Sequence, residues 1–247
     1  MASSSVPASV LDDYRFREVF NQTLFESHVL RKKIIPEVGF NLNEVEYPQI
    51  KEQIALRGWR RLAAPMTGVS KLLVQEFYAN AVVSDEEVAN ARQLPYKSFV
   101  RGVAVDFSPE NICRVRRFKA ETLGAETDYR TRQAIDQRLD EEFIIHSLVK
   151  TGNKSKITVA NAILIYSIMR GEEVRAEDII ADNMAVIAQG LQGKGNLSFP
   201  TTIYKLCKDA GVPLREFRRT SKIPEEKLIT AKRMESTRIP RNLPQQQ

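Results

Sequence analysis

The sequence predicts a mainly α-helical protein with a small β element, arranged as two helical lobes. Apolar residues recur at helical spacing in several separate segments. One segment near residues 97–107 is instead rich in β-branched and aromatic residues and lies between two prolines. A polar stretch, residues 119–142, separates the two groups of helical segments and offers few apolar side chains to a core. The chain has 247 residues, of which 43% are hydrophobic, so a sizeable core can form.

The predicted organisation has parts that differ in composition, and no internal repeat is found. They are a flexible lead at residues 1–10, an N-terminal helical lobe at 11–118, a linker or truncated junction at 119–142, a C-terminal helical lobe at 143–219, and a basic helix with a Pro/Gln tail at 220–247.

In the N-terminal lobe, helical spacing predicts a helix over residues 11–35, which Pro36 ends, and a short helix that ends near Gly58. Trp59 follows as a core anchor. Apolar residues at i, i+3, i+4 and i+8 predict an amphipathic helix over 69–81. A capping box at 84–87 marks a further helix start.

The β element is predicted to be a strand or hairpin at 99–107, and a new helix starts directly after it. Ser108, Pro109 and Glu110 supply an N-cap hydroxyl, a proline at the first helical position and an acid in the first turn. We therefore expect a helix over 109–118.

The C-terminal lobe is predicted to contain a buried apolar element and a series of helices. Gly190 closes one of these helices, and the loop 190–196 lacks the Ser or Thr that follows Gly-Lys in a phosphate-binding loop. The expected elements are the apolar segment 143–149, a nearly all-apolar helix at 156–170, and helices at 176–189, 201–210 and 213–219. The basic helix of the segment 220–247 is expected over 224–235.

Several classes of protein find no support in the residue pattern. The longest apolar run, residues 163–166, is far shorter than the roughly 20 residues of a membrane span, so no membrane association is expected. Cys113, Cys207, His28 and His146 are scattered, so we expect no metal site and no cofactor. No small-molecule substrate is evident. The N-terminus has no secretory pattern, which favours a nuclear or cytoplasmic location.

The positive charge is concentrated near the C-terminus. Residues 201–247 hold 11 Lys+Arg against 5 Asp+Glu, whereas residues 1–200 hold 26 of each. A localised cluster of cations suits a polyanion such as nucleic acid, although a solvated basic tail has the same composition. The candidate nucleic-acid-binding residues are Lys205, Lys208, Arg215, Arg218, Arg219, Lys222, Lys232 and Arg233.

Residues 206–219 allow two structural interpretations. Gly211 could form the turn of a helix-turn-helix, whose second helix would offer Arg215, Arg218 and Arg219 to DNA. The interpretation we favour is an ordinary helix C-cap at Gly211, followed by a second core helix.

Several fragments, in this order, resemble a plant transposon protein domain found in open reading frames of plant mobile elements. The most specific are Glu-Phe-Tyr-Ala-Asn at 76–80 and Val-Arg-Gly at 100–102. The others are residues 35–40, 57–59, 157–160, 165–171, 199–207 and 210–212. The resemblance covers about residues 25–215. It implies an origin in a transposon or retroelement, and it assigns no activity and no catalytic residues.

One feature departs from that family pattern. The polar stretch that ends at residues 139–141 is joined directly to the apolar stretch from Phe143, where the pattern has a longer segment with another Trp. This indicates an internal deletion or an alternative exon boundary at the junction between the lobes.

Three functions compete. The first is a non-enzymatic, transposable-element-derived protein that binds nucleic acid or self-assembles through its basic C-terminal segment. The second is a domesticated protein–protein interaction module that uses an exposed face of the 69–81 helix or the β element. The third is a transposase or nuclease with metal-binding carboxylates, which the sequence supports least because only Asp106 lies on a predicted strand. No catalytic residue is proposed.

Overall fold

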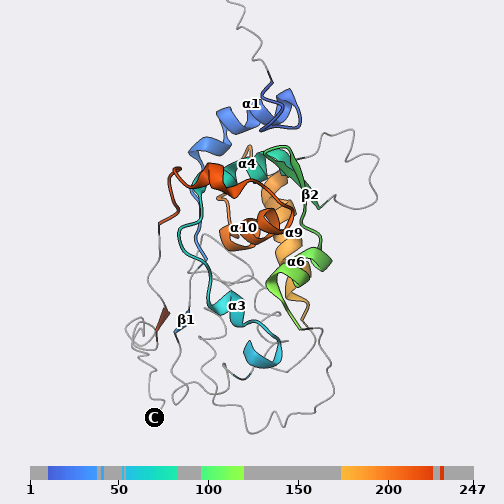
Figure 1. The fold of residues 1–247 in the computed structure, drawn as a ribbon, viewed down its shortest axis with the longest axis vertical. Helices are drawn as coiled ribbons and strands as arrows, with labels where there is room; N and C mark the ends of the chain where they lie inside the picture. The colour runs from blue at the N-terminus through green and yellow to red at the C-terminus, as the bar shows by residue number, and fades with distance from the viewer. Residues whose placement is uncertain are drawn as a thin grey trace, which may run out of the picture.

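The computed structural model describes residues 11–37, 40–41, 52, 54–82, 96–119, 174–224 and 229–230. These residues confirm the predicted class, mainly α-helical with a small β element (Figure 1). In chain order the elements are α1 (Val19–Ser27), the 3-10 helix η1 (Val29–Arg31), β1 (Phe40–Asn41), α3 (Arg60–Ala63), α4 (Lys71–Ala81), β2 (Lys97–Val100), β3 (Val103–Asp106), α6 (Pro109–Arg116), α9 (Ala176–Gln189), α10 (Pro200–Asp209), the 3-10 helix η4 (Leu214–Phe217) and β4 (Ile229–Thr230).

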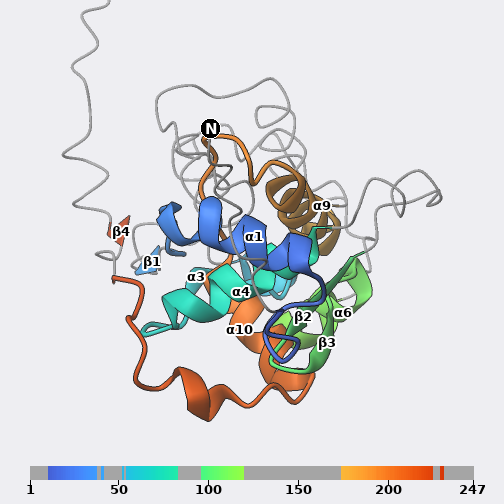
Figure 2. The same cartoon turned by 90° about the horizontal axis from the view of Figure 1, so that it is seen from above.

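Helix α4 is the centre of the described core. It lies between α1 and α10 and also packs against α9 and β2 (Figure 2). The Ser70 hydroxyl caps its N-terminus by accepting a hydrogen bond from the Leu73 amide at 3.2 Å. Every residue from 73 to 81 is buried. The helix is where the sequence predicts it, but the prediction that one of its faces is polar and exposed is wrong. Neighbouring elements cover the helix on all sides, and its polar residues pair inside the protein.

The helices from both predicted lobes share one hydrophobic core. Phe77 of α4, Met184 of α9 and Ile203 of α10 all belong to it and are fully buried. Trp59 is buried in the same core, as predicted. The predicted linker from residue 120 onward, the capping box at 84–87 and the elements at 143–149 and 156–170 lie outside the described residues. The boundary between the lobes thus stays a prediction.

Several predicted elements are confirmed. The β element is an antiparallel hairpin of β2 and β3, in which Val100 pairs with Val103. Helix α6 begins at Pro109, and the Ser108 hydroxyl accepts a hydrogen bond from the Asn111 amide. Helix α9 has the predicted bounds, with Gly190 as its C-cap.

Three predicted helices differ from the structure. The first helix starts at Val19, because residues 12–16 form a turn closed by the Asp12 carbonyl. The helix predicted at 213–219 is one 3-10 turn, η4. At residues 229–230 the structure has a strand, β4, paired in parallel with β1 instead of the helix predicted over 224–235. Ile229 and Thr230 are both β-branched, which favours the extended backbone.

A buried carboxylate, Glu76 of α4, connects three distant parts of the chain. Its side chain is 0% exposed. It accepts a hydrogen bond from Arg15 Nε at 2.8 Å and two from Arg101, from Nε at 2.8 Å and from Nη2 at 2.9 Å. Asn80, one turn further along α4, donates to the Arg15 carbonyl at 2.8 Å and accepts from the Arg17 amide at 3.0 Å. The N-terminal segment and the hairpin are thus both fastened to α4 by polar contacts.

The hairpin turn places Arg101 where it meets this carboxylate. Arg101 and Gly102 have φ values of 49° and 78°, the paired left-handed conformation of a two-residue turn. Glycine adopts it without strain, whereas arginine does not. The Gly102 amide also donates to the Tyr14 carbonyl at 2.9 Å. Arg101 is held in its strained conformation by the two bonds to Glu76 and by the rings of Tyr14 and Phe217.

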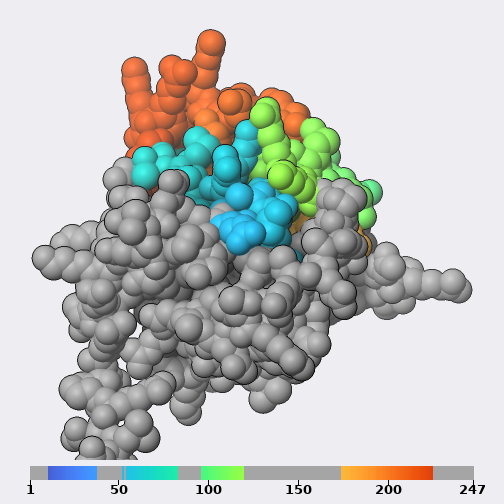
Figure 3. Space-filling view, turned by 90° about the horizontal axis from the view of Figure 1, so that it is seen from below, coloured from blue at the N-terminus to red at the C-terminus, as the bar shows by residue number. Residues whose placement is uncertain are grey.

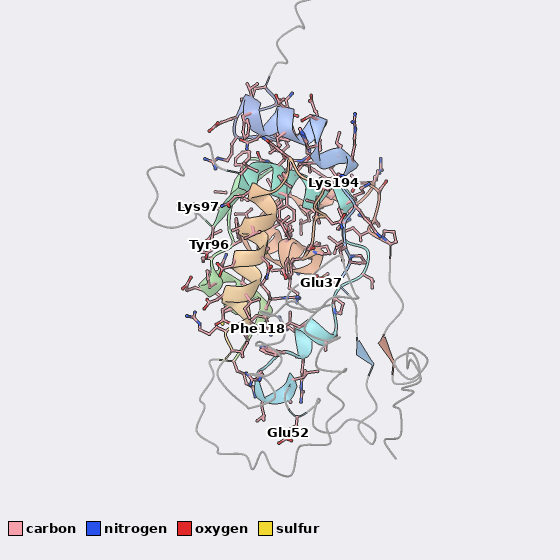
Figure 4. All side chains as sticks on the ribbon, turned by 180° about the vertical axis from the view of Figure 1, so that it is seen from behind. Glu37, Glu52, Tyr96, Lys97, Phe118 and Lys194 are labelled. Atoms are coloured by element: carbon pink, nitrogen blue, oxygen red, sulfur yellow. The ribbon has the colours of Figure 1, made fainter. Side chains whose placement is uncertain are left out.

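A second buried ion pair joins the N-terminal segment to α6 and α10. The Arg116 side chain is 0% exposed, and its Nη2 donates to Glu37 Oε1 at 2.6 Å. Glu37 Oε2 accepts from the Thr201 amide at 2.6 Å, in the first turn of α10. A carboxylate at a helix N-terminus satisfies free amides and the positive end of the helix dipole. Figure 4 shows Glu37 beside α10.

We predict that Glu76→Gln destabilises the protein by about 3 kcal/mol, because the change removes the charge that pairs with Arg15 and Arg101. Urea unfolding followed by circular dichroism measures this loss. The control Glu110→Gln changes an exposed acid in the first turn of α6 and should cost less than about 1 kcal/mol. Equal stability of the Glu76→Gln protein and the wild type would contradict the role given to the pair.

Candidate nucleic-acid interface

The basic segment that follows Pro200 folds back along the start of α4. Helix α10 ends at Asp209, and Gly211 turns the chain with a φ of 87°. After η4, residues 221–223 lie antiparallel to residues 69–71: the Lys71 amide donates to the Ser221 carbonyl and the Ile223 amide to the Val69 carbonyl, both at 2.9 Å. In Figure 3 this segment, in orange, forms an outer edge with projecting side chains.

This edge carries most of the predicted binding residues. We name it the C-terminal basic face and define it by Lys208, Arg215, Arg218, Arg219 and Lys222, all of which are exposed. The Lys222 ammonium donates to the Phe217 carbonyl at 2.7 Å, which fixes the position of its charge. Of the other predicted residues, Lys205 lies on α10, and Lys232 and Arg233 lie outside the described residues.

Both acids of the segment 200–224 are paired with cations of other elements. Asp209 binds Arg114 of α6 through both carboxylate oxygens. The bond to Arg114 lowers the pKa of Asp209 and raises the pKa of Arg114. Glu216 accepts from Arg101 Nη1 at 3.1 Å and from the Tyr14 hydroxyl at 2.5 Å. The bond to Glu216 raises the pKa of Tyr14.

The cations of the basic face have no such partners. Within the described part of the chain, none of the five lies within 4 Å of a carboxylate oxygen. In the described structure their charge therefore has no carboxylate partner at close range, while the two acids of the segment 200–224, Asp209 and Glu216, are paired with Arg114 and Arg101. Exposed cations without carboxylate partners attract polyanions.

Lys205 differs from the other predicted residues. It is half-buried on α10, and burial, with the positive charges of Arg116 and Arg61, lowers its pKa to about 8. The negative charge of Glu37 opposes that shift only in part. Because its ammonium is half-buried and so less accessible than those of the five exposed cations, we exclude Lys205 from the basic face.

A cavity of about 250 Å³ opens between η4, α10 and the start of α4. Three of the predicted binding residues line it, namely Arg215, Arg218 and Lys222. The other lining residues are Gly68, Ser70, Leu73, Tyr204, Leu214 and Phe217. Ser70 and Tyr204 were not among the residues predicted from the sequence, because the β-bridge that brings residues 69–71 to this segment has no signature in the sequence.

The structure favours the simpler interpretation of Gly211. Its positive φ ends α10, as expected of a helix C-cap glycine. The element that follows is a single 3-10 turn with Phe217 buried beneath it, which is shorter than the core helix that we expected and shorter than a recognition helix. Arg215, Arg218 and Arg219 are therefore presented by a turn and not by a helix in a helix-turn-helix.

No other chemistry is evident among the residues that the structure describes. Burial raises the pKa of Cys207, and of Cys113 to a lesser degree, which disfavours the reactive thiolate. The described residues contain no group of three or more His, Cys, Asp or Glu side chains placed to hold a metal ion. Nor does any described helix have the length and apolar composition needed to cross a membrane.

Comparison with protein families identifies the class of protein. Residues 55–213 match the model of the family described as "Putative plant retrotransposon-related domain". The match spans more than half of the 247 residues and includes α4, the hairpin, α6, α9 and α10. The chain belongs to this family, which confirms its origin in a plant transposable element. No curated protein and no solved structure matches the chain.

We predict that Lys205→Met stabilises the protein at pH 7 by about 1 kcal/mol, because it removes a half-buried positive charge. Solvent screens about half of the burial penalty, which limits the gain. The folded-state pKa of about 8 lies below the ordinary value of 10.5. Burial of the charged ammonium thus lowers the free energy of unfolding by its full amount below pH 8, and this loss of stability diminishes as the pH rises toward 10.5.

Urea unfolding at pH 7 and at pH 9.5 checks this expectation. The stability difference between Lys205→Met and wild type should shrink at the higher pH. Lys208→Met, at an exposed position of the same helix, should show no such change. A difference that is the same at both pH values would contradict the lowered pKa.

Proposed function

We propose that this chain is a non-enzymatic, retroelement-derived domain that binds nucleic acid through its C-terminal basic face. One observation carries the proposal: the acids of segment 200–224 pair with Arg114 and Arg101, whereas the cations of the face have no carboxylate partner among the described residues. The face is a fixed surface of the fold, because its segment is hydrogen-bonded to the start of α4.

The expected mode of binding is contact with the phosphate backbone. Arginine offers several donors in a planar fork that suits phosphate oxygens, and the face has three arginines within five residues, at 215, 218 and 219. Such contacts position a protein on nucleic acid without reading its sequence. The affinity should therefore be largely independent of sequence and should fall steeply as salt is added.

The alternative function, a protein–protein interaction module, is expected to use either the helix at 69–81 or the β element, and the structure disfavours the helix. Residues 73–81 of α4 are buried, so that helix offers no exposed face there to a partner. The β2–β3 hairpin remains partly exposed at Phe99 and Val103. Nucleic-acid binding is therefore the function that the described geometry supports best.

We predict that replacing Arg215, Arg218 and Arg219 with alanine weakens binding to a 20-nucleotide single strand and to a 20-base-pair duplex at least tenfold at 100 mM salt. Loss of three phosphate contacts should reduce the slope of log K against log salt by about 2 to 3. Fluorescence anisotropy across a salt series measures both quantities. Substitution is preferable to truncation at Pro200, which would remove the buried residues of α10 from the core.

The matched control replaces Lys33, Lys97 and Lys194 with alanine. All three are exposed, and Figure 4 shows Lys97 and Lys194 on different sides of the described residues. The control lowers the net charge of +6 by the same three units. Equal losses in the two triple variants would attribute binding to overall charge and refute a specific face. No salt-dependent binding by the folded wild type would refute the proposed function itself.

A further inference from the structure

The cavity beside the basic face is lined by apolar and aromatic side chains as well as by cations. Phosphate binding alone would not require the apolar and aromatic side chains. The cavity lining includes three apolar or aromatic side chains, those of Leu73, Phe217 and Tyr204. Leu73 and Phe217 are buried, whereas Tyr204 is half-buried and remains accessible from the cavity. The Tyr204 side chain makes no hydrogen bond, ion pair or ring contact with the rest of the described chain. Tyr204 thus packs against the core and lines the cavity without a polar or ring partner in the described chain.

The polar groups around this apolar surface favour an anion over a cation. Arg215 and Arg218 belong to the lining and have no carboxylate partner in the described chain. Among the residues that the structure describes, no acid lines the cavity. The Ser70 hydroxyl is within 2.7 Å of the Thr220 hydroxyl, and Lys222 donates to the Phe217 carbonyl, so both groups are already engaged at the edge. The ligand that fits has a flat, largely apolar ring with negative charge attached to it.

A nucleotide within a strand has this combination of properties. We propose that the cavity receives one unpaired base of a single-stranded nucleic acid, stacked on Tyr204, with the flanking phosphates on Arg215 and Arg218. This inference rests on the proposed function and adds a preference for single strands. A base within a duplex is paired and stacked on both faces, and extracting it would cost free energy. Aromatic side chains that take up unpaired bases are a common means of binding single strands without reading sequence.

Comparison of three ligands separates base stacking from phosphate contact. They are a 20-nucleotide single strand, an abasic strand with the same number of phosphates, and a duplex of the same length. The wild type should bind the single strand about tenfold more tightly than the abasic strand, within the range that one base–aromatic stack provides. It should bind the single strand more tightly than the duplex at equal salt.

Tyr204→Leu removes the ring, and Tyr204→Phe is the matched control that keeps the ring and removes the hydroxyl. Tyr204→Leu should lose the tenfold preference for the strand with bases, with affinity for the abasic strand and the salt dependence unchanged. Tyr204→Phe should keep the preference. Thermal unfolding of both variants establishes that they are folded.

Photo-crosslinking with the wild-type protein gives a test that needs no variant. A single strand that contains 5-iodouracil, irradiated in the complex and mapped by mass spectrometry, should crosslink at Tyr204. Crosslinks confined to other residues would overturn the inference. Displacement of the strand by a free mononucleotide at the strand's own dissociation constant would overturn it too, because the cavity would then be a nucleotide site.

Failure of this inference is distinguishable from failure of the proposed function. Salt-dependent binding that is equal for the abasic strand and the strand with bases would refute the base pocket and leave the basic face standing. Absence of binding to all three ligands would refute both.

Discussion

The arrangement of the described chain depends on one buried carboxylate, that of Glu76. Without a cation beside it, a fully buried carboxylate would cost several kcal/mol of folding free energy. Arg15 and Arg101 supply the positive charge, one from the N-terminal segment and one from the turn of the hairpin. The central helix can therefore be buried on all sides only when both segments are in place. The Glu37–Arg116 pair works in the same way at the other end of the core, where it joins α6 to the start of α10.

These two networks connect several of the fragments in which the sequence resembles a plant transposon protein domain. Glu76 and Asn80 belong to the Glu-Phe-Tyr-Ala-Asn fragment, and Arg101 belongs to the Val-Arg-Gly fragment. Glu37 lies in another fragment and binds the amide of Thr201 in a third. Tyr78 donates to the Ser198 carbonyl at 3.0 Å, beside that third fragment. In the described structure these residues hold the fold together, and none of them lines the cavity or the basic face.

Local features of the fold were predictable from the sequence, and its long-range polar contacts were not. The start of α6 and the bounds of α9 follow from capping residues and helical spacing. The hairpin follows from its β-branched residues. Burial of α4 on all sides was missed, because Gln75, Glu76 and Asn80 resemble a solvated face until their partners are known. The 229–230 strand was missed because its partner is about 190 positions away.

The same limit applies to the candidate site. Counting charges located the basic segment, since a concentration of cations is visible in any linear sequence. It could not show that Lys205 is half-buried, or that Arg114 and Arg101 neutralise the two acids of the segment. Nor could it bring Tyr204 and Ser70 to one cavity, which requires the return of the chain along α4.

Arg101 has a consequence for how variants of this protein will be interpreted. It shares its guanidinium between Glu76 in the core and Glu216 beside the basic face. Its loss would release a carboxylate one residue from Arg215 and two from Arg218, and that charge would oppose the phosphate contacts that we propose for these arginines. A screen for binding defects would then report Arg101 as a contact residue, although it touches no ligand. The core of this domain thus sets the electrostatic potential of its surface, and a substitution in a fold-defining fragment would change both at once.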